Sequence, residues 1–247
     1  HPPAIHGPHL PGNKPCLIAG KPRHQRRHFL GPAGAAHRVD APDVGAEGLW
    51  VWHGADCVQP SEDRCLVSLS DGGEDAVTVR EFDLKTRTFV TNGFTLSRAK
   101  LRVAWAGRDT ILFARAATPD ELTSSGYPFV VRRLARGQAM EQATEIYRGR
   151  ATDGGYGVTP YTFVDARGRR TSFISRPLST FEFEHYLVRG KDVVQLAIPR
   201  KAGIAEVIDG TAIVRLSEGW TTGSATIPSG AVAAFDLAAN RIGLGRE

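Results

Sequence analysis

The fold is decided by residues 64–90, which read RCLVSLSDGGEDAVTVREFDLKTRTFV. Residues 65–69, 77–84 and 88–90 are rich in residues that favour β-strands, and short polar turns separate them. The first turn, Asp71-Gly72-Gly73, consists of residue types that reach positive φ at low cost. Three antiparallel strands joined in this way form a meander, which cannot bury both of its faces alone. The sequence therefore predicts a larger all-β assembly.

The strand over residues 77–84 of this meander has counterparts later in the chain. Leu84 stands at its end, and the equivalent apolar residues are Leu134, Val188 and Leu237, at spacings of 50, 54 and 49 residues. A repeat of about 50 residues with about four strands is typical of a β-propeller blade. We predict an all-β, partial β-propeller of about four blades, each an antiparallel four-stranded sheet. The alternative is an ordinary β-sandwich with coincidental spacing.

Other segments complete the expected blades. Asp209-Gly210 between two apolar runs is the strongest two-residue hairpin signal in the chain. Residues 49–52 predict a short aromatic strand, which we expect to end in a loop over residues 53–63. Residues 118–125 predict a long polar loop. We expect four tryptophans to pack between blades: Trp50, Trp52, Trp105 and Trp220.

The first part of the chain has a different composition. Residues 1–46 hold six of the eight histidines and eight of the 15 prolines, without a helical or strand period. We therefore predict a disordered arm over residues 1–46 and the propeller domain over residues 47–247. There are two alternatives for this arm. The segment from His24 to His28 could contact phosphates, or the histidines could bind a metal loosely.

The charge is concentrated in the same part. Residues 1–39 contain six Lys or Arg and no acid, so they carry +6; because the whole chain carries +5, the remainder sums to −1. We therefore expect no nucleic-acid partner for the folded part.

Three cysteines, Cys16, Cys57 and Cys65, make no disulfide framework. We predict reduced thiols in a cytoplasmic protein, with a Cys57–Cys65 bridge as the alternative. Apolar runs are too short to predict a membrane span or a signal peptide.

Several separate segments carry a resemblance to a known family. Residues 65–84 resemble the first blades of the prolyl oligopeptidase family of serine peptidases, and three further segments match in the family's order. These are Gly93-Phe94-Thr95-Leu96, Ser125-Gly126-Tyr127-Pro128 and residues 220–230, WTTGSATIPSG. The resemblance covers about residues 48–237. It implies a seven-bladed propeller that admits short peptides to an α/β-hydrolase domain, whose Ser-Asp-His triad cleaves after proline or related residues.

The chain departs from that pattern in two ways. About four blade periods are present where the family has seven, and the hydrolase domain is absent from this sequence. We therefore expect the substrate-gating part of a peptidase that is inactive alone. In the full-length parent its partners would be a peptide substrate and the α/β-hydrolase domain. The alternative is a stand-alone propeller-like module that binds a protein or peptide.

The serines and histidines of the chain do not form a catalytic pattern. A nucleophile elbow needs Gly-x-Ser-x-Gly, and neither Ser70 nor Ser229 has both glycines. His185 lies within a predicted strand, where we expect a hydrogen-bonded or exposed side chain rather than a catalytic base. Residues 71–75 lack the ligand spacing of a calcium loop, and residues 154–158 precede no helix that could hold phosphate. We expect no catalytic, cofactor-binding or metal-ligating residue in this chain.

Overall fold

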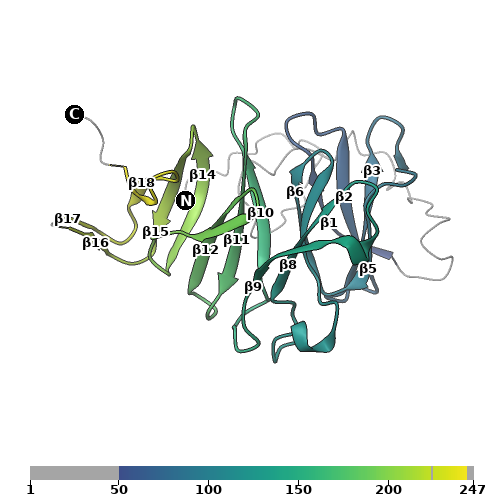
Figure 1. The fold of residues 1–247 in the computed structure, drawn as a ribbon, viewed down its shortest axis with the longest axis horizontal. Helices are drawn as coiled ribbons and strands as arrows, with labels where there is room; N and C mark the ends of the chain where they lie inside the picture. The colour runs from purple at the N-terminus through teal and green to yellow at the C-terminus, as the bar shows by residue number, and fades with distance from the viewer. Residues whose placement is uncertain (1–49, 224, 244–247) are drawn as a thin grey trace, which may run out of the picture. The chain divides into compact units, whose positions relative to one another are not determined.

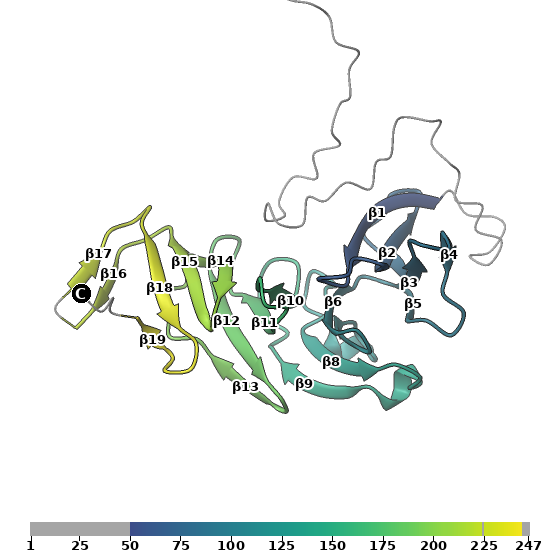
Figure 2. The ribbon, with the colours of Figure 1, turned by 90° about the horizontal axis from the view of Figure 1, so that it is seen from above.

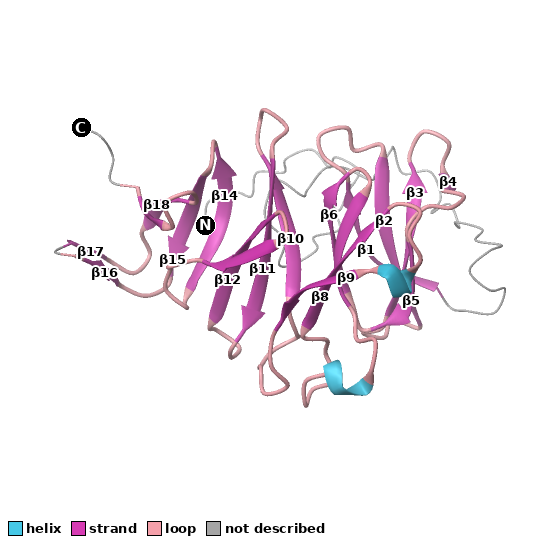
Figure 3. Ribbon diagram, viewed as in Figure 1, coloured by secondary structure: helices cyan, strands magenta, loops and turns pink. Residues whose placement is uncertain are grey.

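The computed structural model describes residues 50–223 and 225–243. Four antiparallel sheets of four or five strands each follow one another along this part of the chain, as Figures 1 and 3 show. The predicted all-β propeller architecture with about four blades is confirmed. The predictions for residues 1–46, including disorder, phosphate contact, metal binding and the state of Cys16, lie outside the described residues. The domain boundary between residues 46 and 47 stays a prediction for the same reason.

Each sheet contains one propeller blade, numbered here in chain order. Blade 1 consists of β1 (Trp50–Cys57), β2 (Arg64–Asp71), β3 (Val77–Asp83), β4 (Thr88–Phe89) and β5 (Thr95–Ala99). Blade 2 consists of β6 (Arg102–Gly107), β7 (Thr110–Ala114), β8 (Val130–Ala135) and β9 (Thr144–Arg148). Blade 3 consists of β10 (Thr159–Val164), β11 (Arg170–Pro177), β12 (Phe183–Arg189) and β13 (Asp192–Gln195). Blade 4 consists of β14 (Ala202–Ile208), β15 (Thr211–Leu216), β18 (Val232–Asp236) and β19 (Arg241–Ile242).

The repeat anchors occupy equivalent places in the four blades. Leu134 and Val188 lie in the third strands β8 and β12, while Leu84 and Leu237 directly follow the third strands β3 and β18. The first strands lie next to one another, since β10 contacts both β6 and β14 and β1 contacts β6. Figure 2 shows the sheets following each other in chain order. The period of about 50 residues in the sequence thus corresponds to the end of the third strand in each blade.

Three local predictions were wrong or incomplete. The first strand does not end at Trp52: β1 continues to Cys57 and pairs with β2, so the expected loop over residues 53–63 is shorter. β5 adds an unpredicted strand to blade 1 by pairing with β3. A small hairpin, β16 (Trp220–Thr222) with β17 (Ala225–Ile227), interrupts blade 4 between its second and third strands. Short polar strands of this kind lack the apolar alternation on which the sequence argument depends.

The turns adopt the geometry that their residues favour. Asp209 and Gly210 both have positive φ, 48° and 81°, as a two-residue hairpin between β14 and β15 requires. Gly72 and Gly73 also have positive φ in the turn between β2 and β3. The Asp83 carboxylate accepts the N–H groups of Lys85 and Thr86 and so closes the next turn. The pairings β2–β3 and β3–β4 confirm the meander expected from residues 64–90, and the pairing β14–β15 confirms the hairpin expected at Asp209-Gly210.

The core lies between blades rather than within one. In β7, Ile111 and Phe113 join the cluster shared with blade 1, whereas Leu112 and Ala114 join the cluster shared with blade 3. Alternate side chains of a strand point to opposite faces of its sheet, so both faces of blade 2 are buried. Each fully buried leucine or phenylalanine stabilises this stacking by about 1.5–3 kcal/mol.

The tryptophans divide between two environments. Trp105 is buried between blades 1 and 2, edge-on to Phe94, and its Nε1–H donates a 2.8 Å hydrogen bond to the Asp56 carbonyl oxygen. Trp220 packs against the core shared by blades 3 and 4. Trp52, in contrast, is 46% exposed, so its expected burial between blades was wrong. An amphipathic aromatic ring on a first strand cannot be assigned to either face without the neighbouring sheet.

The prediction of reduced thiols was wrong for two of the three cysteines. Cys57 at the end of β1 and Cys65 in β2 are directly opposite in the strand pairing and form a disulfide bond. This outcome corresponds to the bridge across a hairpin that was the alternative. The bond closes the loop between the first two strands of blade 1.

Candidate functional site

His185 is not arranged as a catalytic base. The Tyr161 hydroxyl lies 2.8 Å from its Nδ1, and the Ala202 carbonyl oxygen lies 3.1 Å from its Nε2. Burial lowers the pKa of His185, which favours a neutral ring that donates to Ala202 and accepts from Tyr161. Both ring nitrogens are therefore used in holding β12 against β10 and β14. The expectation of a hydrogen-bonded strand histidine is confirmed.

The two serines considered as nucleophiles take no part in this arrangement. Ser70 is buried in β2, where its hydroxyl contacts the Val51 carbonyl oxygen at 3.5 Å. Ser229 is exposed in the connection that follows the β16–β17 hairpin. Neither has a hydrogen bond to a histidine among the described residues. The structure therefore brings no two of Ser70, Ser229 and His185 together.

No metal-binding cluster is found in the part of the chain that the structure describes, where three or more His, Cys, Asp or Glu side chains never converge. Asp75, from the turn considered as a calcium loop, instead accepts a 2.7 Å hydrogen bond from the Tyr127 hydroxyl. Residues 154–158 form a loop between β9 and β10. These placements agree with turns that serve the fold.

One cluster gathers on the loops at one end of the blades, and we name it the tyrosine cluster: Asp75, Lys100, Tyr127 and Tyr156. The Lys100 ammonium lies 4.2 Å above the Tyr127 ring and 4.0 Å from the Asp75 carboxylate. Tyr156 meets Tyr127 edge-on at 5.3 Å and is 68% exposed. The hydrogen bond to Asp75 raises the pKa of Tyr127, so its hydroxyl stays protonated. The cluster offers an exposed ring beside one positive and one negative charge, which suits binding rather than proton transfer.

All four members come from connections at the same end of the sheets. Asp75 lies between β2 and β3, Lys100 between β5 and β6, Tyr127 between β7 and β8, and Tyr156 between β9 and β10. Antiparallel order places these connections together. No signal in the sequence predicts this cluster, although Tyr127 belongs to the segment 125–128 that carries the family resemblance. Four residues spread over more than 80 positions give no local pattern.

Ion pairs with buried carboxylates hold the loops at this end. The Glu121 carboxylate, which is only 4% exposed, accepts hydrogen bonds from Arg132 at 2.5 Å and Arg148 at 3.0 Å. Asp153 accepts two from Arg176, at 2.6 and 2.8 Å. The bond from Arg132 is the main reason why the pKa of Glu121 falls to about 2. These pairs fix the loops that carry the tyrosine cluster, because paired buried charges hold one geometry.

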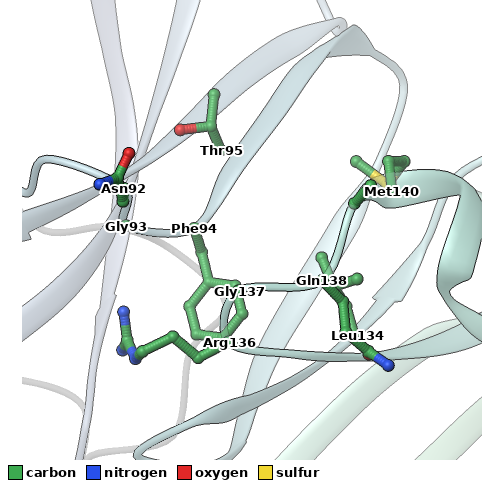
Figure 4. Close-up of a pocket in the computed structure, with 10 residues that line it drawn as sticks. Asn92, Gly93, Phe94, Thr95, Leu134, Arg136, Gly137, Gln138 and Met140 are labelled. Carbon is green, nitrogen blue, oxygen red and sulfur yellow. The ribbon is translucent and has the colours of Figure 1, made fainter.

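Two cavities lie between blades. The first, about 350 Å³, lies between blades 1 and 2, and Figure 4 shows Phe94, Arg136 and Met140 among its lining residues. Its Arg136 stacks on Phe94 and already pairs with Glu81 and Asp109, so its charge is satisfied within the protein. The second, about 330 Å³, lies between blades 3 and 4. Among its lining residues are two phenylalanines and two cations.

Comparison with known proteins gives the relation to a family. The model of the N-terminal β-propeller domain of prolyl oligopeptidase matches residues 34–158, just over half of the chain. An uncharacterized peptidase of Sinorhizobium fredii is 37% identical over 214 residues, which is 81% of this chain and 28% of that protein. An uncharacterized peptidase of Rickettsia prowazekii is 30% identical over 155 residues, 56% of this chain and 20% of that protein. The chain thus spans less than a third of the length of these relatives.

Solved structures show the same fold. A post-proline cleaving enzyme from Rickettsia typhi superposes with a TM-score of 0.69 at 24% identity, covering 80% of this chain and 30% of that enzyme. A structure from work on two prolyl endopeptidases superposes with a TM-score of 0.59 at 11% identity, covering 81% of this chain and 28% of that one. With the match of the family model over half of its length, the chain belongs to the prolyl oligopeptidase family, in which it corresponds to the N-terminal β-propeller domain.

Proposed function

We propose that this chain is the substrate-gating propeller of a peptidase that hydrolyses short peptides after proline. The bond would be broken through an acyl-enzyme formed on a serine that is not among the described residues. The observation that carries the proposal is the series of four blades, which matches the propeller part of the post-proline cleaving enzyme from Rickettsia typhi. The partners in this proposal are a peptide substrate and an α/β-hydrolase domain.

The site geometry supports a gating role over a catalytic one. His185 has both ring nitrogens engaged, and no serine hydroxyl donates to it among the described residues. Without a nucleophile, base and orienting acid within hydrogen-bond reach, acyl transfer has no route here. The tyrosine cluster instead offers exposed ring surface on loops held by buried ion pairs. Such a surface can bind and orient an extended peptide.

The experiment compares this chain with a longer protein that contains it. The purified 247-residue chain should give no turnover of a proline-containing chromogenic peptide. The longer protein should cleave it, should lose activity to a serine-directed inhibitor, and should cleave the same sequence far more slowly inside a folded protein. Inhibitor-sensitive turnover by the 247-residue chain alone would contradict the proposal.

A cytoplasmic location is part of the proposal, and the disulfide offers a way to test it. No helix in residues 50–223 and 225–243 is long and apolar enough to cross a membrane. Reducing compartments keep most thiols free, whereas oxidising ones retain disulfides. Thiol trapping in freshly lysed cells should therefore find Cys57 and Cys65 reduced if the protein is cytoplasmic. A bonded pair, with the protein released by disruption of the cell envelope alone, would contradict this location.

A further inference from the structure

The cavity between blades 3 and 4 opens at one end of both sheets. Its walls come from the end of β11, the start of β12, the start of β14 and the end of β15, which antiparallel pairing places together. Its volume is about 330 Å³, at the lower end of the range for small-molecule sites. The buried His185 forms part of the lining, and both of its ring nitrogens are hydrogen-bonded, so it offers no free base to the cavity.

One wall is aromatic. Phe181, in the turn between β11 and β12, is 76% exposed, and Phe183 at the start of β12 is half-buried. The turn is held by hydrogen bonds from the Leu178 and Ser179 N–H groups to the Glu182 carbonyl oxygen. An exposed phenylalanine on an ordered turn loses little conformational freedom when it covers an apolar group. This wall therefore suits an apolar side chain.

A second wall is cationic. Lys201 and Arg215 line the cavity, both are exposed, and neither forms an ion pair with another described residue. The nearby Glu218 carboxylate accepts the backbone N–H of Lys201 at 3.0 Å, and its charge is one negative group against these two cations. Arg176, on the neighbouring β11, is by contrast paired with Asp153 and Glu184. The two cations of this wall attract an anion.

There is room beside the arginine for such a group. Gly203 of β14 lies opposite Arg215 of β15 in the strand pairing. A Cβ at Gly203 would meet no atom within 4 Å, so the space in front of the pair is open. The planar guanidinium can bind both oxygens of a carboxylate at once.

We propose that this cleft binds the C-terminal residue of a peptide that ends in an apolar side chain. The carboxylate would pair with Arg215 and Lys201, and the side chain would lie against Phe181 and Phe183. A carboxylate and an apolar side chain on one residue occur together only at a peptide C-terminus, which distinguishes this ligand from an internal Asp or Glu. The inference deepens the proposed function and rests on it, since it names the peptide end that the propeller holds.

The test is a titration of the whole 247-residue chain, followed by calorimetry, with acetyl-Ala-Phe as the free acid and as the C-terminal amide. The acid should bind, and the amide should bind at least about tenfold more weakly because it lacks the charge for Arg215. Arg215→Gln should weaken the acid by a similar factor and leave the amide unchanged. Lys191→Gln removes one positive charge on the turn between β12 and β13, outside this cleft, and should change neither affinity.

A second variant separates loss of binding from loss of folding. Phe181→Ala alters an exposed side chain, so the unfolding temperature should not change, while the affinity for the acid should fall. Equal affinity for acid and amide would overturn the proposal. So would unchanged binding by Arg215→Gln, or no saturable binding at about 10 mM acid.

These results are independent of peptidase activity. Selective binding of the acid, with no cleavage of proline peptides by the longer protein, would support peptide binding at the cleft and contradict the proposed function. Cleavage by the longer protein, with equal binding of acid and amide, would support the proposed function and contradict recognition of a C-terminal carboxylate at the cleft.

Discussion

Arg136 of blade 2 donates two hydrogen bonds, of 2.8 and 3.0 Å, to the carboxylate of Glu81 in blade 1. The Phe94 N–H donates a third, at 2.9 Å, to the same buried carboxylate. Burial alone would raise the pKa of Glu81, but the bonds from Arg136 and Phe94 outweigh it and lower the pKa. One carboxylate with these donors joins the first two blades.

We expect Glu81→Gln to destabilise the protein by about 3 kcal/mol, since it leaves the Arg136 guanidinium at a blade interface without its buried partner. Asp109→Asn is the matched control, because it removes the other carboxylate that pairs with Arg136, at an exposed position. The control substitution should lower the free energy of unfolding much less. Chemical unfolding of the two variants measures the difference, and equal losses would show that Glu81 has no special part in joining the blades.

Stability should fall in acid through Glu121. The pKa of Glu121 is about 2 in the folded chain, below its ordinary value of 4.5. The ionised carboxylate therefore contributes fully to the free energy of unfolding above pH 4.5, and this contribution is lost as the pH falls towards 2. The shift corresponds to a difference on the order of 3 kcal/mol. Wild type should exceed Glu121→Gln in unfolding free energy at about pH 7, and the gap should close near pH 2.

Glu145→Gln serves as the control for this titration. Glu145 pairs with the same arginines, Arg148 and more distantly Arg132, but its side chain is far more exposed. Its variant should differ little from wild type across this pH range. A gap between wild type and Glu121→Gln that does not change with pH would be inconsistent with the assigned pKa.

Reduction of the disulfide should lower stability. Cys57 and Cys65 are eight residues apart, and closing a loop of that size contributes about 2.5 kcal/mol in the chain-entropy model. The midpoint of chemical unfolding should shift downward when dithiothreitol is added to wild type. The Cys57→Ala, Cys65→Ala double variant should be insensitive to the reductant. A wild-type midpoint that is the same with and without reductant would mean that the bond does not contribute to stability.

Gly157 and Gly168 allow a test of close packing at matched backbone geometry. Their φ values are +73° and +76°, so alanine is strained by about 1 kcal/mol at either position. A Cβ at Gly157 would lie 2.4 Å from the Pro128 carbonyl oxygen, whereas at Gly168 it would meet nothing within 4 Å. Gly157→Ala should therefore cost at least about 2 kcal/mol more than Gly168→Ala in thermal or chemical unfolding. Equal costs would show that the β9–β10 loop yields easily.

Strands could be predicted where a single segment is long enough to show an apolar run or alternation bounded by turn residues. Residues 111–114 form a continuous apolar run, which is typical of a strand buried on both faces, and β7 is buried in this way between blades 1 and 3. The β16–β17 hairpin was missed, because its strands are three residues long and mostly exposed. The Cys57–Cys65 bond was only an alternative, since the register that opposes the two cysteines depends on β1 continuing beyond Trp52.

By itself, the sequence determined the all-β class, the number of blades and the positions of most hairpins. These follow from apolar alternation, turn residues and a spacing near 50 residues, all of which act over short stretches of chain. Only the tertiary structure decided that Ile111 faces blade 1 while Leu112 faces blade 3, and that Arg215 and Lys201 share a cleft with Phe181. Such contacts arise when one sheet stacks on the next, and stacking joins residues whose separation along the chain leaves no local pattern.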